Sequence, residues 1–346
     1  MCQIAGYIGK RPAAPILIDM MRRQEGWDGG FYTGMATMSG GRFYMNKVVG
    51  DLDKLIQNHT PDDFPGTVGF IHSRTPGGVG QATSKWAHPF FSTDGSLLYI
   101  ANGTGGNFAN TSSPLRDGVY MKLKTAGYRF SSATEGAGTN YTLRSDGLHI
   151  HTTDITCQSI QKYMDAGYSV PEACALANQE LPGEIVGLAM HLGEPDCISW
   201  VRINYPMYVG IADHGIYLAT TPQAMPEDAR EITLLSPLSS GRVYRDRFET
   251  IPFPNPEITV APVTPAVWKA CYDAMETALK TQEMHHDQLD ALIRPLFPEA
   301  TCPPDSAVNY AIMNEFEKSG RLEIIHTRVP GQLPGTTAPR RTARLK

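Results

Sequence analysis

The first 250 residues carry a pattern of short apolar runs, most of which end at polar turn residues. Runs rich in β-branched and aromatic residues that end at Gly, Asn or Asp predict β-strands. The predicted strands are Gln3–Ile8, Thr33–Met38, Val68–Ser73, Leu97–Ala101, Glu184–His191, Met207–Ala212 and Gly215–Thr220. Apolar residues at helical spacing predict helices over Pro15–Gln24, Ser159–Ala166 and Pro171–Glu180. Because strands and helices do not alternate regularly, the pattern favours a layered α+β fold, which we assign to residues 2–250.

The pattern changes after residue 250. Five prolines from Pro252 to Pro265 predict a stiff linker over residues 251–265. Beyond it, helical patterns and one strand pattern cover Pro265–His285, Asp287–Phe297, Ser306–Ser319 and Leu322–Val329. Three helices followed by a strand resemble a winged helix, so we expect residues 266–330 to form a small helical domain of that kind. We expect the basic residues 331–346 to be a flexible tail.

Composition narrows the class of protein. The chain has 346 residues, of which 41% are hydrophobic, so it can bury a large core. A net charge of −5 argues against binding to nucleic acids or membrane surfaces by charge. No apolar run approaches the roughly 18 residues of a membrane span, and no signal peptide is evident. Six scattered cysteines without a CxxC pair are typical of reduced thiols, so we expect a cytoplasmic protein.

Cys2 is the first candidate for chemistry. Removal of Met1 would leave this residue with both a thiol and a free α-amine. Such an amine has a pKa of about 7.7–8.0, so it can accept the thiol proton at working pH. The thiol would then be a nucleophile without a separate histidine base. By itself, a cysteine at this position is more typical of an inert thiol.

Two further segments contain polar residues at the ends of predicted strands. Gly69–Arg74 is a buried-looking strand that ends in an arginine, a residue that is seldom buried without a partner. Leu97–Ala101 ends at Asn102-Gly103. An Asn-Gly pair usually marks a turn. It also offers a side-chain amide and a backbone N–H near one point, as an oxyanion hole requires.

These segments stand in the order of a known family. The motifs are Cys2–Gly9, Gly26–Gly30, His72–Arg74, Ala87–Pro89 and Asn102–Gly103. They resemble the class II, N-terminal-nucleophile glutamine amidotransferase domains, such as the glutaminase half of glucosamine-6-phosphate synthase, phosphoribosyl amidotransferase and glutamate synthase. The resemblance extends over about residues 2–250. It implies a four-layer αββα sandwich.

The resemblance also implies roles for residues. Cys2 would attack the amide carbon of glutamine, and Asn102 and Gly103 would hold the oxyanion. Arg74 would bind the α-carboxylate, and the loop that follows it, which includes Gly77, would close over glutamine.

The residue that grips the α-amine of glutamine is left open. Thr153-Asp154 precedes a predicted helix, as the corresponding Asp does in the family. Gly127–Phe130, however, resembles the segment that leads directly to that Asp, which would give the role to Glu135. An insertion of about twenty residues would reconcile the two readings. We prefer Asp154, although a simple helix cap is a further interpretation of that residue.

Three positions depart from the family pattern. Gln3 follows the nucleophile where the family has Gly, and Glu25 stands where the family has Arg. The loop after Arg74 reads Thr-Pro-Gly-Gly in place of Trp-Ala-Thr-His-Gly. These departures put the affinity for glutamine, and activity itself, in question.

Residues 251–346 are too few for the synthase domains that usually receive the ammonia. We therefore expect a synthase partner on another chain, similar to glutamate synthase or to an amino-sugar synthase. No metal, flavin or nucleotide cofactor is expected, and the chain is compatible with a homo-oligomer. His285-His286-Asp287 suggests metal binding, but neighbouring histidines on a helix point to different faces, so we interpret them as a solvated surface.

The alternative function is a catalytically degenerate glutamine sensor that acts through a C-terminal winged helix. Residues 251–346 contain ten Lys and Arg against eleven Asp and Glu. They lack the basic face that DNA binding needs, so nucleic acid is not the expected partner and protein docking is favoured.

Overall fold

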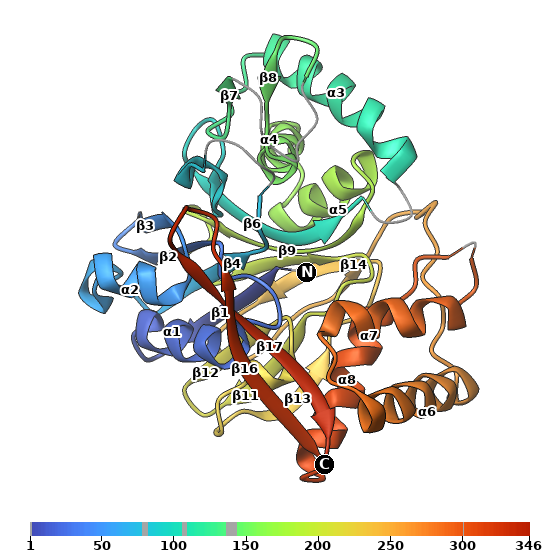
Figure 1. Ribbon diagram of the computed structural model, residues 1–346. Helices are drawn as coiled ribbons and strands as arrows, with labels where there is room; N and C mark the ends of the chain where they lie inside the picture. Colours follow the sequence, from blue (N-terminus) through green and yellow to red (C-terminus); the bar gives the residue numbers. More distant parts are fainter. Residues whose placement is uncertain (1, 78–81, 106–108, 136–143, 300) are drawn as a thin grey trace.

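Two antiparallel β-sheets lie face to face in the computed structural model, which describes residues 2–77, 82–105, 109–135, 144–299 and 301–346 (Figure 1). The first sheet has seven strands, in the order β13 (Arg230–Leu234), β11 (Tyr208–Ala212), β12 (Gly215–Ala219), β1 (Gln3–Gly9), β4 (Val68–Arg74), β2 (Tyr32–Ser39) and β3 (Arg42–Val49). The second sheet has six, in the order β15 (Ile251–Pro252), β14 (Ser239–Val243), β10 (Ile198–Arg202), β9 (Glu184–His191), β6 (Leu97–Thr104) and β5 (Phe90–Phe91).

Strand β1 shows why the sequence folds in this way. Alternate residues of a strand point to opposite faces of its sheet. Ile4 and Ile8 therefore face the second sheet, where they share a core with Leu188, while Ala5 and Tyr7 face the helical layer. Because both faces are buried, the strand is an almost continuous apolar run instead of an alternating one.

Helices cover the outer face of each sheet. The first sheet is covered by α1 (Ala13–Gln24) and α2 (Leu52–Asn58), and the second by α4 (Thr152–Asp165) and α5 (Val170–Glu180). A further helix, α3 (Ala109–Thr125), packs beside α4, near the small hairpin of β7 (Thr134–Glu135) and β8 (Leu148–His149). The expected α+β class is confirmed, and the layers run helix, sheet, sheet, helix.

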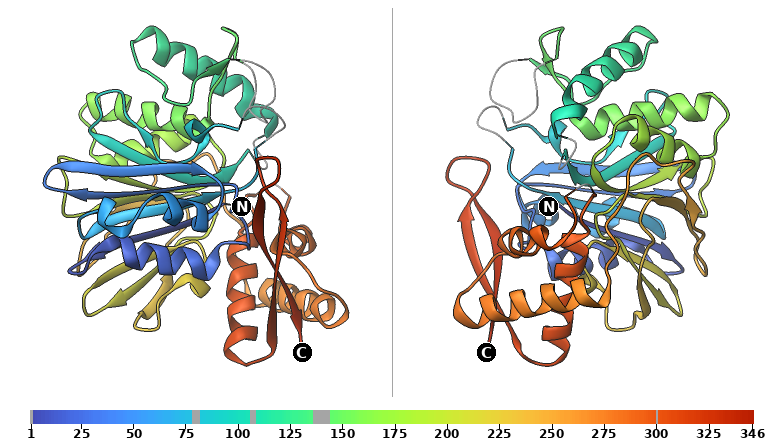
Figure 2. Two further views of the ribbon diagram at one scale, coloured as in Figure 1. Left: turned by 60° about the vertical axis from the view of Figure 1, so that its left-hand side comes forward. Right: turned by 90° about the vertical axis from the view of Figure 1, so that its right-hand side faces the viewer.

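The C-terminal unit contains three helices and a β-hairpin (Figure 2). These elements are α6 (Pro265–Thr281), α7 (His286–Ile293), α8 (Asp305–Lys318), β16 (Leu322–Pro330) and β17 (Thr337–Leu345). They enclose their own apolar core, to which Trp27 from the first 250 residues also contributes. The helices and the first strand follow the predicted pattern, and the assignment to the winged-helix class stays a prediction.

The expectation of a flexible tail after residue 330 is wrong. Thr337–Leu345 forms β17, which pairs with β16 along its whole length. Arg341 in this strand donates hydrogen bonds to the backbone oxygens of Arg22, Arg23 and Glu25. The basic residues had suggested a solvated segment, but this arginine holds β17 against the end of α1. None of the helices in the described ranges is long and apolar enough to cross a membrane.

Candidate active site

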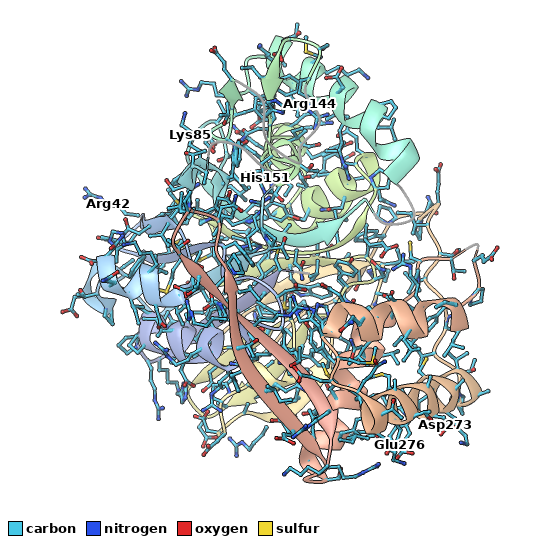
Figure 3. The ribbon with its side chains drawn as sticks, in the orientation of Figure 1. Arg42, Lys85, Arg144, His151, Asp273 and Glu276 are labelled. Carbon is cyan, nitrogen blue, oxygen red and sulfur yellow. The ribbon has the colours of Figure 1, made fainter. Side chains whose placement is uncertain are left out.

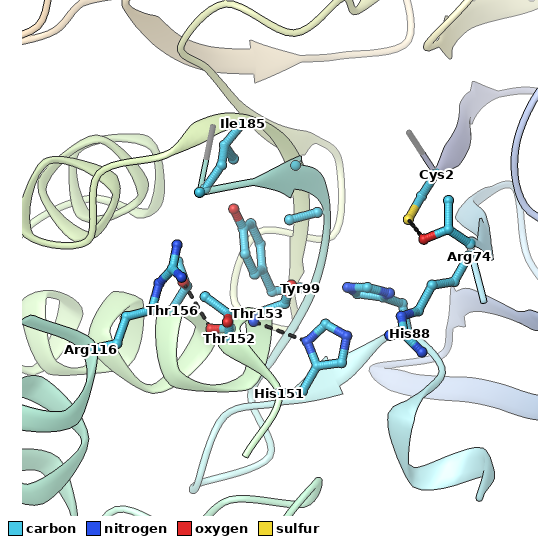
Figure 4. Close-up of a pocket in the computed structure, with 14 residues that line it drawn as sticks. Cys2, Arg74, His88, Tyr99, Arg116, His151, Thr152, Thr153, Thr156 and Ile185 are labelled. Carbon is cyan, nitrogen blue, oxygen red and sulfur yellow. Dashed lines mark hydrogen bonds between the residues drawn. The ribbon is translucent and has the colours of Figure 1, made fainter. Parts of the chain in front are cut away.

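Cys2 lies where the two sheets meet, directly before β1 (Figure 4). Its backbone nitrogen donates a 2.8 Å hydrogen bond to Asn102 Oδ1, although the two residues belong to opposite sheets. Its Sγ lies 3.8 Å from Thr75 Oγ1. The other five cysteines are buried, whereas Cys2 is partly exposed. Cys2 is therefore the thiol best placed to meet a substrate.

The end of β6 supplies the candidate oxyanion hole. Asn102 is 1% exposed, and its Nδ2 has no hydrogen-bond partner. Since Oδ1 is held by the Cys2 nitrogen, the amide is oriented with Nδ2 as the available donor. Gly103 lies in close contact with β9, because a Cβ at this position would stand 2.5 Å from the backbone oxygen of Glu184. Only glycine fits there without a shift of the backbone.

Arg74 ends β4, the neighbour of β1 in the first sheet. Its guanidinium lies over the ring of Tyr32, 4.8 Å from the ring centroid. Stacking on an aromatic face restricts the orientation of the planar guanidinium. The arginine lines the same cavity as Cys2.

This cavity has a volume of about 310 Å³. Fourteen of the described residues line it, namely Cys2, Arg74, Thr75, His88, Tyr99, Ala101, Gly103, Gly105, Arg116, His151, Thr152, Thr153, Thr156 and Ile185. Its size is at the lower end of the range typical of small-molecule sites. Three of the predicted site residues, Cys2, Arg74 and Gly103, thus line one cavity, and Asn102 is bonded to the first of them.

A group of buried histidines borders the cavity. The rings of His72 and His88 lie 3.7 Å apart, and those of His88 and His151 lie 4.9 Å apart. Burial lowers the pKa of His72 to about 3 and holds the pKa values of His88 and His151 well below the usual range. All three are therefore neutral at physiological pH and do not act as fixed charges.

The residues predicted to bind the amine of glutamine lie elsewhere. The Asp154 carboxylate is fully buried and accepts hydrogen bonds from Ser132 N at 2.7 Å, Ser132 Oγ at 2.8 Å and Gln158 Nε2 at 3.1 Å. Burial raises its pKa. The carboxylate anchors the loop before β7 and is not among the groups that line the cavity.

The helix-cap interpretation of Asp154 is wrong, since His151 is the N-cap of α4. Glu135, the other candidate for the amine, is exposed in β7 and lies outside the cavity lining.

Gly77 is held by the C-terminal unit. Its backbone nitrogen donates a 2.8 Å hydrogen bond to the side-chain oxygen of Gln332, at the tip of the β16–β17 hairpin. Residues 78–81, which continue this loop, lie outside the described residues. The predicted glutamine loop is thus in contact with a segment more than 250 positions away in the sequence.

Both single-residue departures from the family pattern have a structural partner. Gln3 donates from Nε2 to the hydroxyl oxygen of Tyr310 at 3.0 Å. Its other amide atom, Oε1, accepts a hydrogen bond from Thr220 Oγ1 at 2.7 Å. Glu25 accepts hydrogen bonds from Ser73 Oγ at 2.6 Å and from the Leu52 nitrogen at 3.0 Å. Burial raises the pKa of Glu25 to about 7. Gln3 is thus bonded to α8 of the C-terminal unit, and Glu25 is bonded to β4 and to the start of α2.

The interpretation of His285 and His286 as a solvated surface is wrong, because both are buried. His286 is bonded to Asp28 and stacks on Tyr310, with ring centroids 5.3 Å apart. Burial alone lowers the pKa of His286, but Tyr310 and the carboxylates of Asp28 and Asp290 raise it well above its usual value. The His286–Asp28 pair is an ion pair that fixes the loop after α1.

Arg294 forms a second link between the C-terminal unit and the site. It pairs with Glu184, at the start of β9, and with Asp305, at the start of α8. Thr104, at the end of β6, lies opposite Glu184 in the strand register. The C-terminal unit therefore contacts both the strand that follows Cys2 and the strand next to Gly103.

Sequence reasoning missed Arg116, His151 and the threonines at the start of α4. Arg116 lies in α3, which contains Pro114 and was not predicted as a helix. His151 precedes a helix whose start was placed several residues too late.

Comparisons with known proteins agree with this geometry. No family model matches the chain. The glutamine–fructose-6-phosphate aminotransferase of Mesorhizobium japonicum is 29% identical over 249 residues, which is 71% of this chain and 36% of that protein. The enzyme of the same name from Pyrococcus horikoshii is 23% identical over 291 residues, 83% of this chain and 40% of that protein. The chain thus matches little more than a third of the length of these relatives.

Solved structures share the fold. The glutamine phosphoribosylpyrophosphate amidotransferase of B. subtilis, complexed with ADP and GMP, superposes with a TM-score of 0.54 at 14% identity, over 75% of this chain and 51% of that one. A structure described as the allosteric regulatory enzyme of purine biosynthesis superposes with a TM-score of 0.59 at 14% identity, over 96% of this chain and 67% of that one. The chain therefore has the fold of N-terminal-nucleophile amidotransferases. More particularly, its sequence is similar to the glutamine amidotransferases of class II, with Cys2 at the nucleophile position.

Proposed function

We propose that this protein hydrolyses the side-chain amide of glutamine with Cys2 as nucleophile. The proposal rests above all on the 2.8 Å hydrogen bond from the Cys2 nitrogen to Asn102 Oδ1, which leaves Asn102 Nδ2 as an unpartnered, buried donor beside the thiol. A nucleophile and an oriented donor next to one cavity are the two parts that acyl transfer needs.

In the proposed reaction, removal of Met1 gives Cys2 a free α-amine, which takes the thiol proton. The sulfur bonds to the amide carbon, and the carbonyl oxygen becomes an oxyanion held by Asn102 Nδ2 and the Gly103 N–H. When the tetrahedral species collapses, the C–N bond breaks and the nitrogen takes the proton and leaves as ammonia. Water then cleaves the γ-glutamyl thioester, which yields glutamate and regenerates the thiol.

Arg74 is assigned to the α-carboxylate of glutamine in this scheme. Its guanidinium is already fixed over Tyr32, so little conformational freedom is lost when a carboxylate binds. The assignments to Arg74, Asn102 and Gly103 follow the resemblance to class II domains. The position of Arg74 and Gly103 in the cavity lining, and the hydrogen bond between Asn102 and Cys2, support them.

The ammonia acceptor is proposed to bind outside residues 1–346. The partner is a synthase, supplied in trans and similar to an amino-sugar synthase or to glutamate synthase. The names of the relatives, which transfer an amino group to fructose 6-phosphate, support the first type.

Intact-mass analysis after incubation with 6-diazo-5-oxo-norleucine tests the nucleophile. This glutamine analogue should add once to a chain that lacks Met1. The adduct should be absent in Cys2→Ala and retained in Cys197→Ala, which removes a buried thiol as a matched control. An adduct that persists in Cys2→Ala, or no adduct on a wild-type chain with a free Cys2 amine, would contradict the proposal.

One observation favours a second function, a glutamine-responsive regulatory protein. The hydrogen bond from Gly77 to Gln332 connects the predicted glutamine loop to the C-terminal unit. Through this contact, glutamine binding would change the conformation of the C-terminal unit. In that case glutamine should bind to the wild-type chain without ammonia release. Calorimetry together with an ammonia assay separates the two functions.

A further inference from the structure

The Cys2 cavity has a second end, remote from the nucleophile. Figure 4 shows Cys2 and Arg74 on one side of the cavity and Arg116 on the other, with the threonines of α4 between them. Nothing in the proposed hydrolysis of glutamine uses this second end. We therefore ask which further chemical group of the substrate the side chains at this end could bind.

Arg116 lies at this end beside another arginine. Its Nε has no hydrogen-bond partner, and no carboxylate of the described residues contributes to its pKa, which burial and the charge of Arg144 lower. Arg144 is only 4% exposed and lies in the same region as His151 (Figure 3). Arg116 is partly buried, and the Asp117 and Asp146 carboxylates that act on Arg144 do not act on it, so an anion placed beside Arg116 would stabilise its charge.

The start of α4 adds a second positive feature. This 14-residue helix begins at Thr152, and its N-cap His151 accepts a 3.1 Å hydrogen bond from the Thr153 nitrogen. Thr152, Thr153 and Thr156 line the cavity. The N-terminus of a helix carries a partial positive charge, so this wall favours an anion although the Thr153 and Asp154 nitrogens are already bonded to His151.

His88 provides an independent sign of a ligand. It is 1% exposed and lines the cavity, yet neither of its ring nitrogens has a hydrogen-bond partner. Buried polar atoms are almost always hydrogen-bonded, so such a side chain is best explained by a ligand that supplies the partner. His88 lies between Arg74 and His151, midway along the cavity (Figure 4).

We propose that Arg116 and the N-terminus of α4 form a second anion-binding subsite, and that the preferred substrate is an α-N-acylated glutamine whose acyl chain ends in a carboxylate. This inference rests on the proposed function at Cys2. Arg74 binds the α-carboxylate, Arg116 binds the acyl carboxylate, and His88 faces the linking amide. Acylation replaces the α-ammonium by a neutral group, which agrees with the engagement of Asp154 inside the protein.

Steady-state hydrolysis of three amides tests the subsite: glutamine, N-acetylglutamine and N-succinylglutamine. Wild type should show a kcat/KM at least about tenfold higher for the succinyl than for the acetyl compound, because the added carboxylate makes a charge-assisted contact. Arg116→Gln should abolish that ratio. Lys122→Gln removes an exposed positive charge from the same helix and should leave the ratio intact.

Equal kcat/KM values for the two acyl compounds in wild type, or a preference for free glutamine, would overturn the subsite while the proposed function stands. An equal loss on both compounds in Arg116→Gln would overturn it as well. If no amide is hydrolysed, the proposed function fails, and calorimetry of N-succinylglutamine with Cys2→Ala and Cys2→Ala/Arg116→Gln still tests the subsite. Should Arg116→Gln not fold, Arg116→Lys, which keeps the charge without the planar fork, should reduce the ratio.

Discussion

Gln3 donates a 3.0 Å hydrogen bond to the hydroxyl oxygen of Tyr310, which joins the residue after the nucleophile to α8 of the C-terminal unit. Both side chains are fully buried. The strand that carries Cys2 is therefore fixed at its first residue by a helix that lies 300 positions later. His286, which is paired with Asp28, stacks on the same tyrosine, so one contact area holds two segments of the site.

Tyr310→Phe should lower both stability and turnover. The substitution leaves Gln3 Nε2 buried without an acceptor, a loss of about 1–3 kcal/mol in the free energy of unfolding. Because the strand that follows Cys2 loses an anchor, kcat should fall more than KM rises. Urea unfolding and steady-state kinetics measure the two effects. Tyr272→Phe, whose hydroxyl is bonded to the half-exposed Arg321, is the control, and an equal loss in both variants would contradict this reading.

Asn102→Ala should lower kcat by about 10²–10³, which corresponds to roughly 2.7–4 kcal/mol of transition-state stabilisation. The substitution removes Nδ2, the free donor, and also the acceptor of the Cys2 nitrogen. The Kd for glutamate, which lacks the tetrahedral oxyanion, should change much less. Single-turnover kinetics and calorimetry make the comparison, and a parallel loss of glutamate binding would argue against an oxyanion role.

Arg74→Lys should raise KM even though the charge is kept. Lysine has no planar fork for a carboxylate and does not stack on Tyr32 in the same way. A lost charge-assisted hydrogen bond corresponds to about 1.5–3 kcal/mol, so kcat/KM should fall by roughly ten- to a hundredfold. Kinetics with glutamine and with a glutamine analogue that lacks the α-carboxylate provide the check. The second substrate should be affected little, and an equal loss on both would contradict the assignment.

Glu25 should make stability depend on pH. Burial raises its pKa to about 7 in the folded protein, from about 4.5 in the unfolded chain. Its stabilising, protonated form is fully present below pH 4.5 and is lost as the pH rises through 7. The loss amounts to about 3 kcal/mol at most. Glu25→Gln should remove this slope, so the variant should gain stability relative to wild type between pH 5 and 8. Thermal melts across that range with an unchanged slope would contradict the prediction.

Much of the fold could be predicted from the sequence because its strands are apolar on both faces. β1, β4, β6 and β9 were each predicted to within a few residues. The same signal was not available for α3, where Pro114 interrupts a largely polar helix, so Arg116 was missed.

The site was predicted where each residue directly follows a predicted strand, as Arg74 and Asn102 do; the structure includes both residues in the strands themselves. Contacts between distant segments were not predictable in this way. Asp154 was expected to face glutamine, but its partner Ser132 lies in an unpatterned loop. Gln3 and Glu25 were identified only as departures from a pattern, because their partners are fixed by the tertiary structure. The basic C-terminal segment was expected to be flexible. The backbone oxygens that Arg341 binds could not be identified from the sequence.

Gln332→Ala tests whether the C-terminal hairpin influences the loop beside Cys2. The Gln332 side chain is the acceptor for Gly77 N, and Thr75, two residues earlier, contacts the thiol. The side chain lies at a partly exposed hairpin tip, so its removal should change the free energy of unfolding by less than about 0.5 kcal/mol. A loop without this contact should bind substrate less well, so KM should rise severalfold while kcat changes less. Leu333→Ala truncates the exposed neighbour on the same tip, and equal KM values in the two variants would show that the hairpin has no effect on the loop.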